Sequence, residues 1–213
     1  MNKPRVLLGD DHALILSGVR ATLAPRYDVV GEATDGRALV AAAERLQPDI
    51  VILDISMPLL NGFEAARQLR LSLPAAKLIF LSQHLSPAYL RQAIEIGVTG
   101  YVLKSETTEE LEPAINAVLK GETFISPRFG DEALSKMRGR DGALNRVQGD
   151  LTERQRQILQ LLADGQSNKE AAAILNLSVK TIEFHRAKMM SKLGAHSGAE
   201  LTRIAIQQGI IPE

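Results

Sequence analysis

Three carboxylates stand at the ends of two short apolar segments of the 213-residue chain. Asp10 and Asp11 follow the segment Arg5–Gly9, and Asp54 closes the segment Ile50–Asp54. Continuous apolar segments of this length are typical of strands buried on both faces of a parallel sheet. In a sheet of order 2-1-3-4-5, the carboxyl ends of the first and third strands meet where the strand order reverses. Because three neighbouring acids repel one another, this pattern favours a bound hard cation.

Two further polar residues, Ser82 and Lys104, follow later apolar segments and are expected at the same edge. The chemistry that needs such a set is phosphoryl transfer to a carboxylate. A divalent cation, in the first place Mg²⁺, would neutralise the acids and the incoming phosphoryl oxygens. Lys104 would supply a positive charge, Ser82 a hydroxyl donor, and Asp54 the nucleophile. Each residue alone is more often a solvated loop residue or a helix cap, so only the combination favours this function.

The elements that would position these groups alternate between strand and helix through the first 120 residues. This alternation predicts an α/β fold with a five-stranded, doubly wound parallel sheet. The expected strands cover Arg5–Gly9, Tyr27–Ala33, Ile50–Asp54, Lys77–Ser82 and Gly100–Leu103. The expected helices lie near Ala13–Leu23, Gly36–Leu46, Gly62–Leu71, Pro87–Ile96 and Thr107–Lys120.

The rest of the chain predicts a linker and a small all-α domain. Residues 123–146 break the alternation and contain scattered glycines, with a possible short helix over Phe129–Met137. Residues 147–213 predict four short helices. Three of the helix starts match the capping box, and a fourth follows Ser178. The boxes are Thr152 with Gln155, Ser167 with Glu170, and Ser197 with Glu200, and the expected C-cap glycines are Gly165 and Gly194.

Composition limits the class of protein further. Residues 1–122 carry 12 Lys and Arg against 15 Asp and Glu, whereas residues 123–213 carry 13 against 10. The basic second half fits an anionic partner. The chain has no Cys, which excludes disulfides and thiolate metal sites. No stretch approaches the roughly 18 apolar residues that span a membrane, and the N-terminus lacks a signal-peptide pattern. We therefore expect a cytoplasmic protein without a membrane partner.

The second half contains a helix-turn-helix pattern that suits double-stranded DNA. A short helix after Ser167 is followed by a turn at Ser178 and a longer helix over Val179–Leu193. Ile182, Met189 and Leu193 share one face of the longer helix and should be core. The candidate DNA contacts lie on its other faces: Lys180, Thr181, Glu183, Phe184, His185, Ala187, Lys188 and Lys192. The outward Phe184 would suit a thymine methyl group. By charge alone, an ordinary lysine-bearing surface helix is an equal alternative.

Residues 1–122 resemble the receiver domain of two-component response regulators, which has a flavodoxin-like fold. The matching motifs are Asp10-Asp11, Leu53–Pro58 with Gly62, Leu81-Ser82 and Tyr101–Lys104. The resemblance implies that a sensor histidine kinase phosphorylates Asp54.

The same resemblance implies further roles at the site. Asp11, Asp54 and the Ser56 carbonyl would ligate Mg²⁺, and Asp10 would act partly through water. Ser82 and Tyr101 would form the conformational switch, although Tyr101 is also compatible with ordinary core packing. This sequence departs from the family pattern at Gln83 and Ser105, which stand where many receivers have a small residue and a proline.

Residues 147–213 resemble the LuxR-type DNA-binding domain through three motifs: Leu151–Arg154, Gly165–Glu170, and Thr181–Arg186 followed by Lys192–Gly194. The resemblance implies that Val179–Leu193 enters the major groove and that the last helix, Ser197–Gln208, pairs two copies. Glu183 stands where many relatives have lysine, and its carboxylate would accept a hydrogen bond from cytosine N4.

Together these patterns predict a response regulator of the NarL/FixJ type. Phosphorylation would promote dimerisation and sequence-specific binding to an operator, and the chain would catalyse only its own phosphotransfer and dephosphorylation.

One alternative is a haloacid-dehalogenase-like phosphatase, but Ser56 stands where that class needs a second acid. Another is a regulator that binds a small effector, although the front half has few aromatics to line a cavity. A nucleotide-binding domain would need a Gly-rich phosphate loop, which is missing. His12 and His84 border the crevice without an assigned role.

Overall fold

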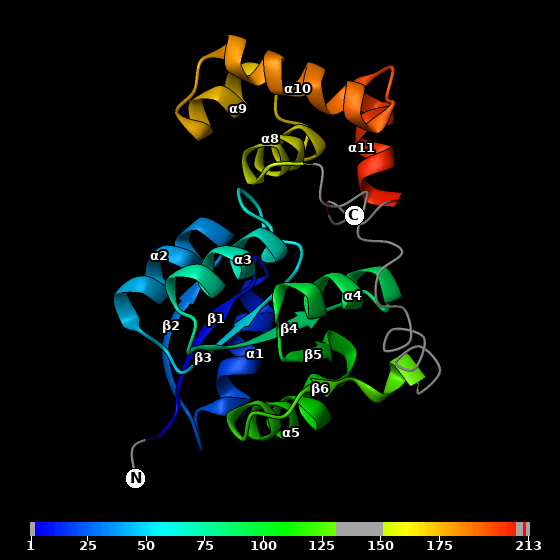
Figure 1. Ribbon diagram of the computed structural model, residues 1–213. Helices are drawn as coiled ribbons and strands as arrows, with labels where there is room; N and C mark the ends of the chain where they lie inside the picture. The colour runs from blue at the N-terminus through cyan, green and yellow to red at the C-terminus, as the bar shows by residue number, and fades with distance from the viewer. Residues whose placement is uncertain (1–2, 131–150, 208–210, 212–213) are drawn as a thin grey trace. The chain divides into compact units, whose positions relative to one another are not determined.

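The computed structural model describes residues 3–130, 151–207 and 211, and the chain forms two compact units (Figure 1). One unit contains residues 3–130, and the other contains the described residues from 151 onward. The predicted domain limits at residues 122 and 147 stay a prediction. Most of the predicted linker, together with all but the first two residues of the possible helix at Phe129–Met137, lies outside the described residues.

A parallel sheet forms the centre of the first unit. Its strands are β1 (Arg5–Gly9), β2 (Asp28–Ala33), β3 (Ile50–Leu53), β4 (Lys77–Ser82), β5 (Gly100–Leu103) and β6 (Phe124–Ile125). They are ordered β2-β1-β3-β4-β5-β6, and all neighbouring pairs are parallel. The order of the first five strands places the reversal between β1 and β3, as predicted.

The prediction of five strands is wrong by one, since the sheet of the first unit has six strands among residues 3–130. β6 pairs with β5 through the partners Gly100 with Phe124 and Tyr101 with Ile125. It occupies the start of the predicted linker. A strand of two residues is too short to show the alternation by which strands are recognised in a sequence.

Helices cover both faces of the sheet (Figure 1). α1 (Ala13–Leu23) and α5 (Thr107–Leu119) pack on one face with a core that includes Leu8, Ile52 and Val102. α2 (Gly36–Leu46), α3 (Gly62–Ser72) and α4 (Pro87–Ile96) cover the other face with a core that includes Val51, Phe80 and Tyr101. Burial on both faces explains the continuous apolar strands, because each fully buried large apolar side chain contributes roughly 1.5–3 kcal/mol.

The second unit contains four described helices: α8 (Glu153–Ala163), α9 (Asn168–Leu175), α10 (Val179–Leu193) and α11 (Gly198–Gln207). Their apolar faces share one core that includes Ile158, Ile182, Met189 and Leu201. Ile182 and Met189 are fully buried, and Leu193 is half-buried beside them. None of the helices that the structure describes in either unit is long and apolar enough to cross a membrane.

The helix ends of the second unit follow the predicted signals closely. Both halves of the capping box are present at Thr152 and at Ser167. At the third box, the Ser197 hydroxyl accepts from the Glu200 N–H, but the Glu200 carboxylate accepts from the N–H of His196. The prediction there is half right. Gly194 caps α10 in the left-handed region at φ 68°, which glycine adopts without strain.

Candidate functional site

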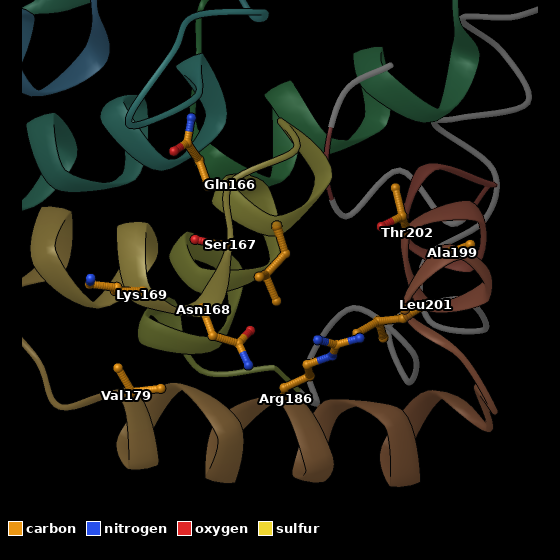
Figure 2. A pocket seen from close by; sticks show the side chains of 11 residues that line it. Gln166, Ser167, Asn168, Lys169, Val179, Arg186, Ala199, Leu201 and Thr202 are labelled. Carbon is orange, nitrogen blue, oxygen red and sulfur yellow. The ribbon is translucent and has the colours of Figure 1, made fainter.

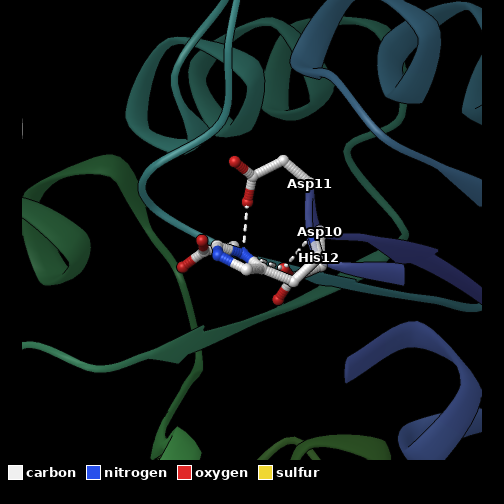
Figure 3. A group of neighbouring side chains, drawn as sticks. Asp10, Asp11 and His12 are labelled. Carbon is white, nitrogen blue, oxygen red and sulfur yellow. Dashed lines mark hydrogen bonds and ion pairs between the residues drawn. The ribbon is translucent and has the colours of Figure 1, made fainter. Parts of the chain in front are cut away.

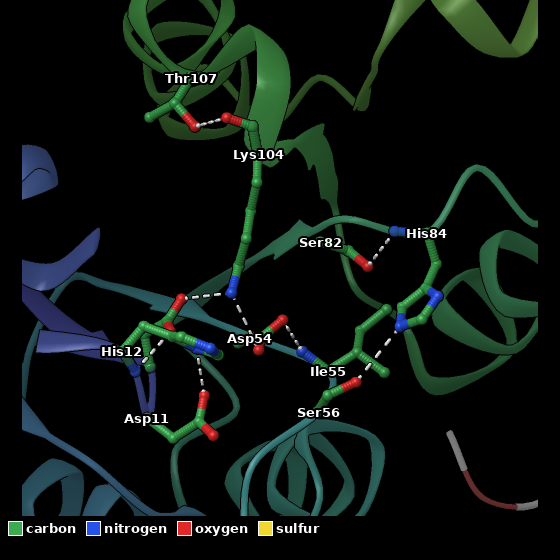
Figure 4. A network of polar contacts seen from close by, with 10 residues as sticks. Asp11, His12, Asp54, Ile55, Ser56, Ser82, His84, Lys104 and Thr107 are labelled. Atoms are coloured by element: carbon green, nitrogen blue, oxygen red, sulfur yellow. Dashed lines mark hydrogen bonds and ion pairs between the residues drawn. The ribbon is translucent and has the colours of Figure 1, made fainter. Parts of the chain in front are cut away.

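The carboxyl ends of β1, β3 and β5 bring three of the predicted groups into contact (Figure 4). The Lys104 ammonium lies 2.7 Å from Asp10 Oδ2 and 3.0 Å from Asp54 Oδ2. The side chains of both acids are only 3% exposed, and that of Lys104 is 13% exposed. One cation therefore bridges two buried carboxylates from neighbouring strands.

The loop after β3 orients the Asp54 carboxylate. Asp54 Oδ1 accepts a hydrogen bond of 2.7 Å from the N–H of Ile55, which leaves Oδ2 facing Lys104. The chain then turns back, so that the N–H of Gly62 donates to the carbonyl of Ile55. A Cβ at Gly62 would lie 2.1 Å from the Asp54 carbonyl oxygen, and therefore only glycine permits this close approach. Asn61 caps the following helix by accepting from the N–H of Glu64.

Asp11 lies at the exposed side of the same site (Figure 3). His12 joins it to Asp10, because the His12 Nδ1 atom lies 2.7 Å from Asp11 Oδ1 and 3.2 Å from Asp10 Oδ1. One ligand atom each from Asp10, Asp11, His12 and Asp54 lies within 4.8 Å of the other three. His12 was not predicted to take part in the site; its position directly after the acid pair was the only sequence signal.

Burial and charge shift the ionisation of the central groups in ways that fit this geometry. Burial raises the pKa of Asp54, and the Lys104 charge partly opposes that shift. Burial pulls the pKa of Lys104 down, but its hydrogen bonds to Asp10 and Asp54 and their charges outweigh burial and raise it. Lys104 therefore stays charged at neutral pH, and its charge favours the ionised form of Asp54.

The donor set suits a hard divalent cation. The cluster contains three carboxylates, and the Lys104 ammonium contacts two of them, so the cluster keeps an excess of negative charge. Oxygen ligands of this kind are those that Mg²⁺ prefers. Metal ligation by these residues, and by the Ser56 carbonyl, stays a prediction.

Ser82 and Tyr101 are connected through His84 in the loop after β4, and Figure 4 shows the contact between Ser82 and His84. Both are buried, with exposed fractions of 0% and 1%. The Ser82 hydroxyl accepts from the His84 N–H at 3.1 Å, and the Tyr101 hydroxyl donates to the His84 carbonyl at 2.9 Å. The His84 ring nitrogen Nε2 lies 3.3 Å from the Ser56 hydroxyl. His84 therefore links three of the predicted residues, although no role was predicted for it.

The predicted recognition helix α10 presents a mixed surface. Phe184 is 56% exposed, and the Lys188 ammonium lies 4.4 Å from the centre of its ring. Thr181 and His185 are half-buried, and the Thr181 hydroxyl lies 2.8 Å from that of Ser178. The remaining candidates are exposed: Lys180, Glu183, Ala187, Lys188 and Lys192. Most of the predicted DNA contacts are thus accessible on one helix.

A cavity of about 580 Å³ lies beside α10 (Figure 2). The first turns of α9 and α11 border it, and Lys169 and Arg186 contribute positive charge. Figure 2 shows the Asn168 and Arg186 side chains directed into the space between these helices. None of the 11 lining residues is acidic. Helix N-termini and cations together favour anions. Neither Lys169 nor Arg186 was among the predicted contacts, because only the fold brings them together.

Comparisons with known proteins agree with both units. Residues 6–116 match the family model of the response regulator receiver domain, and residues 150–205 match that of the luxR family of bacterial regulatory proteins. The transcriptional regulatory protein MctR of Rhizobium johnstonii is 37% identical over 211 residues, which are 98% of this chain and 96% of MctR.

Two solved structures of the response regulator RcsB are similar over nearly the full chain. RcsB of Salmonella typhimurium is 28% identical, with a TM-score of 0.66, and the match covers 98% of this chain and 99% of RcsB. A structure of two RcsB dimers bound to two parallel DNAs is 28% identical with a TM-score of 0.59, covering 97% and 99% of the two chains. The chain therefore belongs to the two-component response regulators that combine a receiver domain with a LuxR-type DNA-binding domain, a family of transcription regulators.

Proposed function

We propose that a sensor histidine kinase phosphorylates this regulator on Asp54 in a Mg²⁺-dependent reaction, and that phosphorylation promotes dimerisation and operator binding. The observation that carries the proposal is the bridge from Lys104 to the two buried acids Asp10 and Asp54, at 2.7 and 3.0 Å. An ordinary surface ion pair would not place one ammonium between two carboxylates that are nearly inaccessible to water.

Each residue of the site has a separate role in the phosphoryl transfer. An oxygen of Asp54 attacks the phosphorus of the kinase phosphohistidine, so that the new P–O bond forms while the P–N bond breaks and the imidazole leaves. Lys104 neutralises a phosphoryl oxygen, and the Ser82 hydroxyl donates to another. Asp11, Asp54 and the Ser56 carbonyl would hold Mg²⁺, with Asp10 acting partly through water. When bound, Mg²⁺ supplies charge neutralisation for the acids and the phosphoryl group. With these groups, the chain catalyses only the transfer of a phosphoryl group to its own Asp54 and the hydrolysis of that phosphoryl group.

The switch begins at Ser82. Its hydroxyl, which now accepts from the His84 N–H, turns toward the phosphoryl group and donates to it. The contact that holds the loop after β4 is then lost, and the position of Tyr101 changes with that loop because its hydroxyl donates to the His84 carbonyl. Phosphorylation thereby shifts an equilibrium between two arrangements of the receiver.

The second unit binds double-stranded DNA through α10 in the major groove. Phe184 contacts a thymine methyl group, Glu183 accepts from cytosine N4, and the exposed lysines contact phosphates. The cavity between α9, α10 and α11 would receive a backbone phosphate, with Lys169 and Arg186 as its cations. The last helix, α11, pairs two copies on a two-half-site operator, in keeping with the similarity to a protein solved as dimers on DNA.

A gel shift tests the coupling between the two units. The probe is a duplex selected from a random pool by protein treated with acetyl phosphate and Mg²⁺. We expect treated wild-type protein to bind this duplex more tightly than untreated protein, and Asp54→Asn to bind weakly under both conditions. Equal affinity in all four lanes would refute the coupling.

A further inference from the structure

The segment Phe124–Phe129, here called the strap, is fastened to Tyr101. It begins as β6, and the N–H of Ser126, the residue after β6, donates to the Tyr101 carbonyl at 2.8 Å. It ends at Phe129, which is only 7% exposed. The Phe129 ring meets the Tyr101 ring edge to face, with 5.2 Å between the centroids. The strap therefore contacts both the backbone and the ring of Tyr101.

Tyr101 connects the strap to the phosphoacceptor site. Its hydroxyl donates to the His84 carbonyl, and the His84 N–H donates to the Ser82 hydroxyl. Three consecutive contacts thus join Phe129 to Ser82. The two contacts of His84 are half-buried, and the ring contact between Tyr101 and Phe129 is buried. Because these groups are packed in contact, a change at Ser82 displaces the next group in the series.

A second set of contacts joins the strap to the segment that follows Lys104. The Arg128 guanidinium lies 3.2 Å from a Glu106 carboxylate oxygen and 3.5 Å from the Ser105 hydroxyl. Lys104 itself contacts Asp54. Both ends of the site, Ser82 and Lys104, are consequently connected to the strap within a few residues.

We propose that the strap reports the state of the phosphoacceptor site to the rest of the chain. This inference rests on the proposed phosphorylation of Asp54. When Ser82 and Lys104 turn toward a phosphoryl group, His84 loses its acceptor, Tyr101 shifts, and Phe129 loses its edge-to-face contact. The strap then loosens. Since it directly precedes the residues that lead to the DNA-binding unit, the change passes along the chain itself and requires no contact between the two units.

Hydrogen exchange of the full chain, read by mass spectrometry, tests this inference with and without acetyl phosphate and Mg²⁺. The N–H groups of Ser126 and Phe129 donate within the described contacts and report on the strap. We expect phosphorylation to make them exchange roughly two- to tenfold faster, as fits the loss of one aromatic contact. Unchanged exchange in protein whose intact mass shows full phosphorylation would overturn the inference. No gain in mass would instead refute the proposed function, and the inference with it.

A pair of matched variants tests the role of the aromatic contact. Phe129 packs in the core that contains Tyr101, whereas Phe124, on the same strap, packs against the core on the other face of the sheet. We expect Phe129→Ala to accept phosphate normally. Its strap N–H groups should exchange fast with or without acetyl phosphate and Mg²⁺, and its DNA affinity should be the same under both conditions. Phe124→Ala should keep the response. If phosphorylation changes strap exchange and DNA affinity in Phe129→Ala as much as in the wild type, the inference is contradicted. If that variant does not fold, the hydrogen-exchange experiment on the wild type still tests the inference.

Discussion

Replacing Lys104 with methionine tests the electrostatic basis of the site, because it removes the ammonium and keeps the apolar stem. In the wild type this ammonium lies 2.7 Å from Asp10 and 3.0 Å from Asp54. The variant leaves two buried carboxylates without a cation. We expect a clear loss of stability in the first unit, together with loss of phosphorylation by acetyl phosphate.

The size of the effect follows from burial. Removing one partner of a buried ion pair costs about 3–5 kcal/mol. The 13% exposure of the Lys104 side chain reduces this value, and we expect roughly 2–4 kcal/mol. At about 4 °C per kcal/mol for a unit of this size, the Tm of the first unit should fall by roughly 8–16 °C.

The effect should also depend on pH with a defined sign. Burial holds the pKa of Asp54 above its ordinary value, and losing Lys104 raises that pKa further. A carboxyl group whose folded-state pKa is raised stabilises the fold at low pH, and this stabilisation is lost as the pH rises through the folded-state pKa. The deficit of the variant should therefore be larger at about pH 8 than at about pH 5.

Differential scanning calorimetry at the two pH values measures both expectations. Lys120→Met is the matched control, since Lys120 is exposed at the end of α5. Adding Mg²⁺ should raise the Tm of Lys104→Met more than that of the wild type, because the cation meets a more negative site. A fall in Tm no larger than that of Lys120→Met, or a deficit that does not change with pH, would refute the electrostatic reasoning.

Three further predictions concern the backbone, the recognition helix and the salt dependence of binding. Gly62→Ala should lower the Tm of the first unit and slow phosphorylation, because its Cβ would lie 2.1 Å from the Asp54 carbonyl oxygen. Gly18→Ala in α1, whose Cβ would meet nothing within 4 Å beyond the local backbone of its own helix, should raise stability by about 0.5–1 kcal/mol in the same thermal scan. Phe184→Ala should weaken binding to the selected duplex by roughly tenfold at every salt concentration, and an unchanged affinity would exclude the thymine contact. Lys180→Ala should instead lower the slope of log affinity against log salt by about 1, and an unchanged slope would exclude a phosphate contact.

The sequence predicted the regular elements of both units with few errors. The predicted bounds of β1, β4 and β5 match those of the structure, as do those of α1, α2 and α4. These elements are marked by apolar runs, by helix periodicity and by capping residues, which are all local signals. Because parallel strands share one carboxyl edge, correct strand ends were enough to predict that Asp10, Asp54 and Lys104 would meet.

The contacts between segments were not predictable in the same way. β6 is too short to show a strand pattern, so its residues were assigned to the linker. The edge-to-face contact of Phe129 with Tyr101 and the position of Arg186 beside the cavity depend on how elements pack. The sequence places His12 and His84 at the border of the site, but their partners, Asp11 and Ser56, follow from side-chain placement. The positions of these side chains depend on tertiary packing, which the spacing and composition of the sequence do not indicate.

The most direct test of the central claim is the intact mass of the full chain after incubation with acetyl phosphate and Mg²⁺. Wild-type protein should gain about 80 Da, the mass of one phosphoryl group. Asp54→Asn should gain nothing, while Asp35→Asn, which changes an acid at the cap of α2, should gain the same mass as the wild type. An equal gain in wild type and Asp54→Asn would contradict the assignment of Asp54 as the phosphoacceptor.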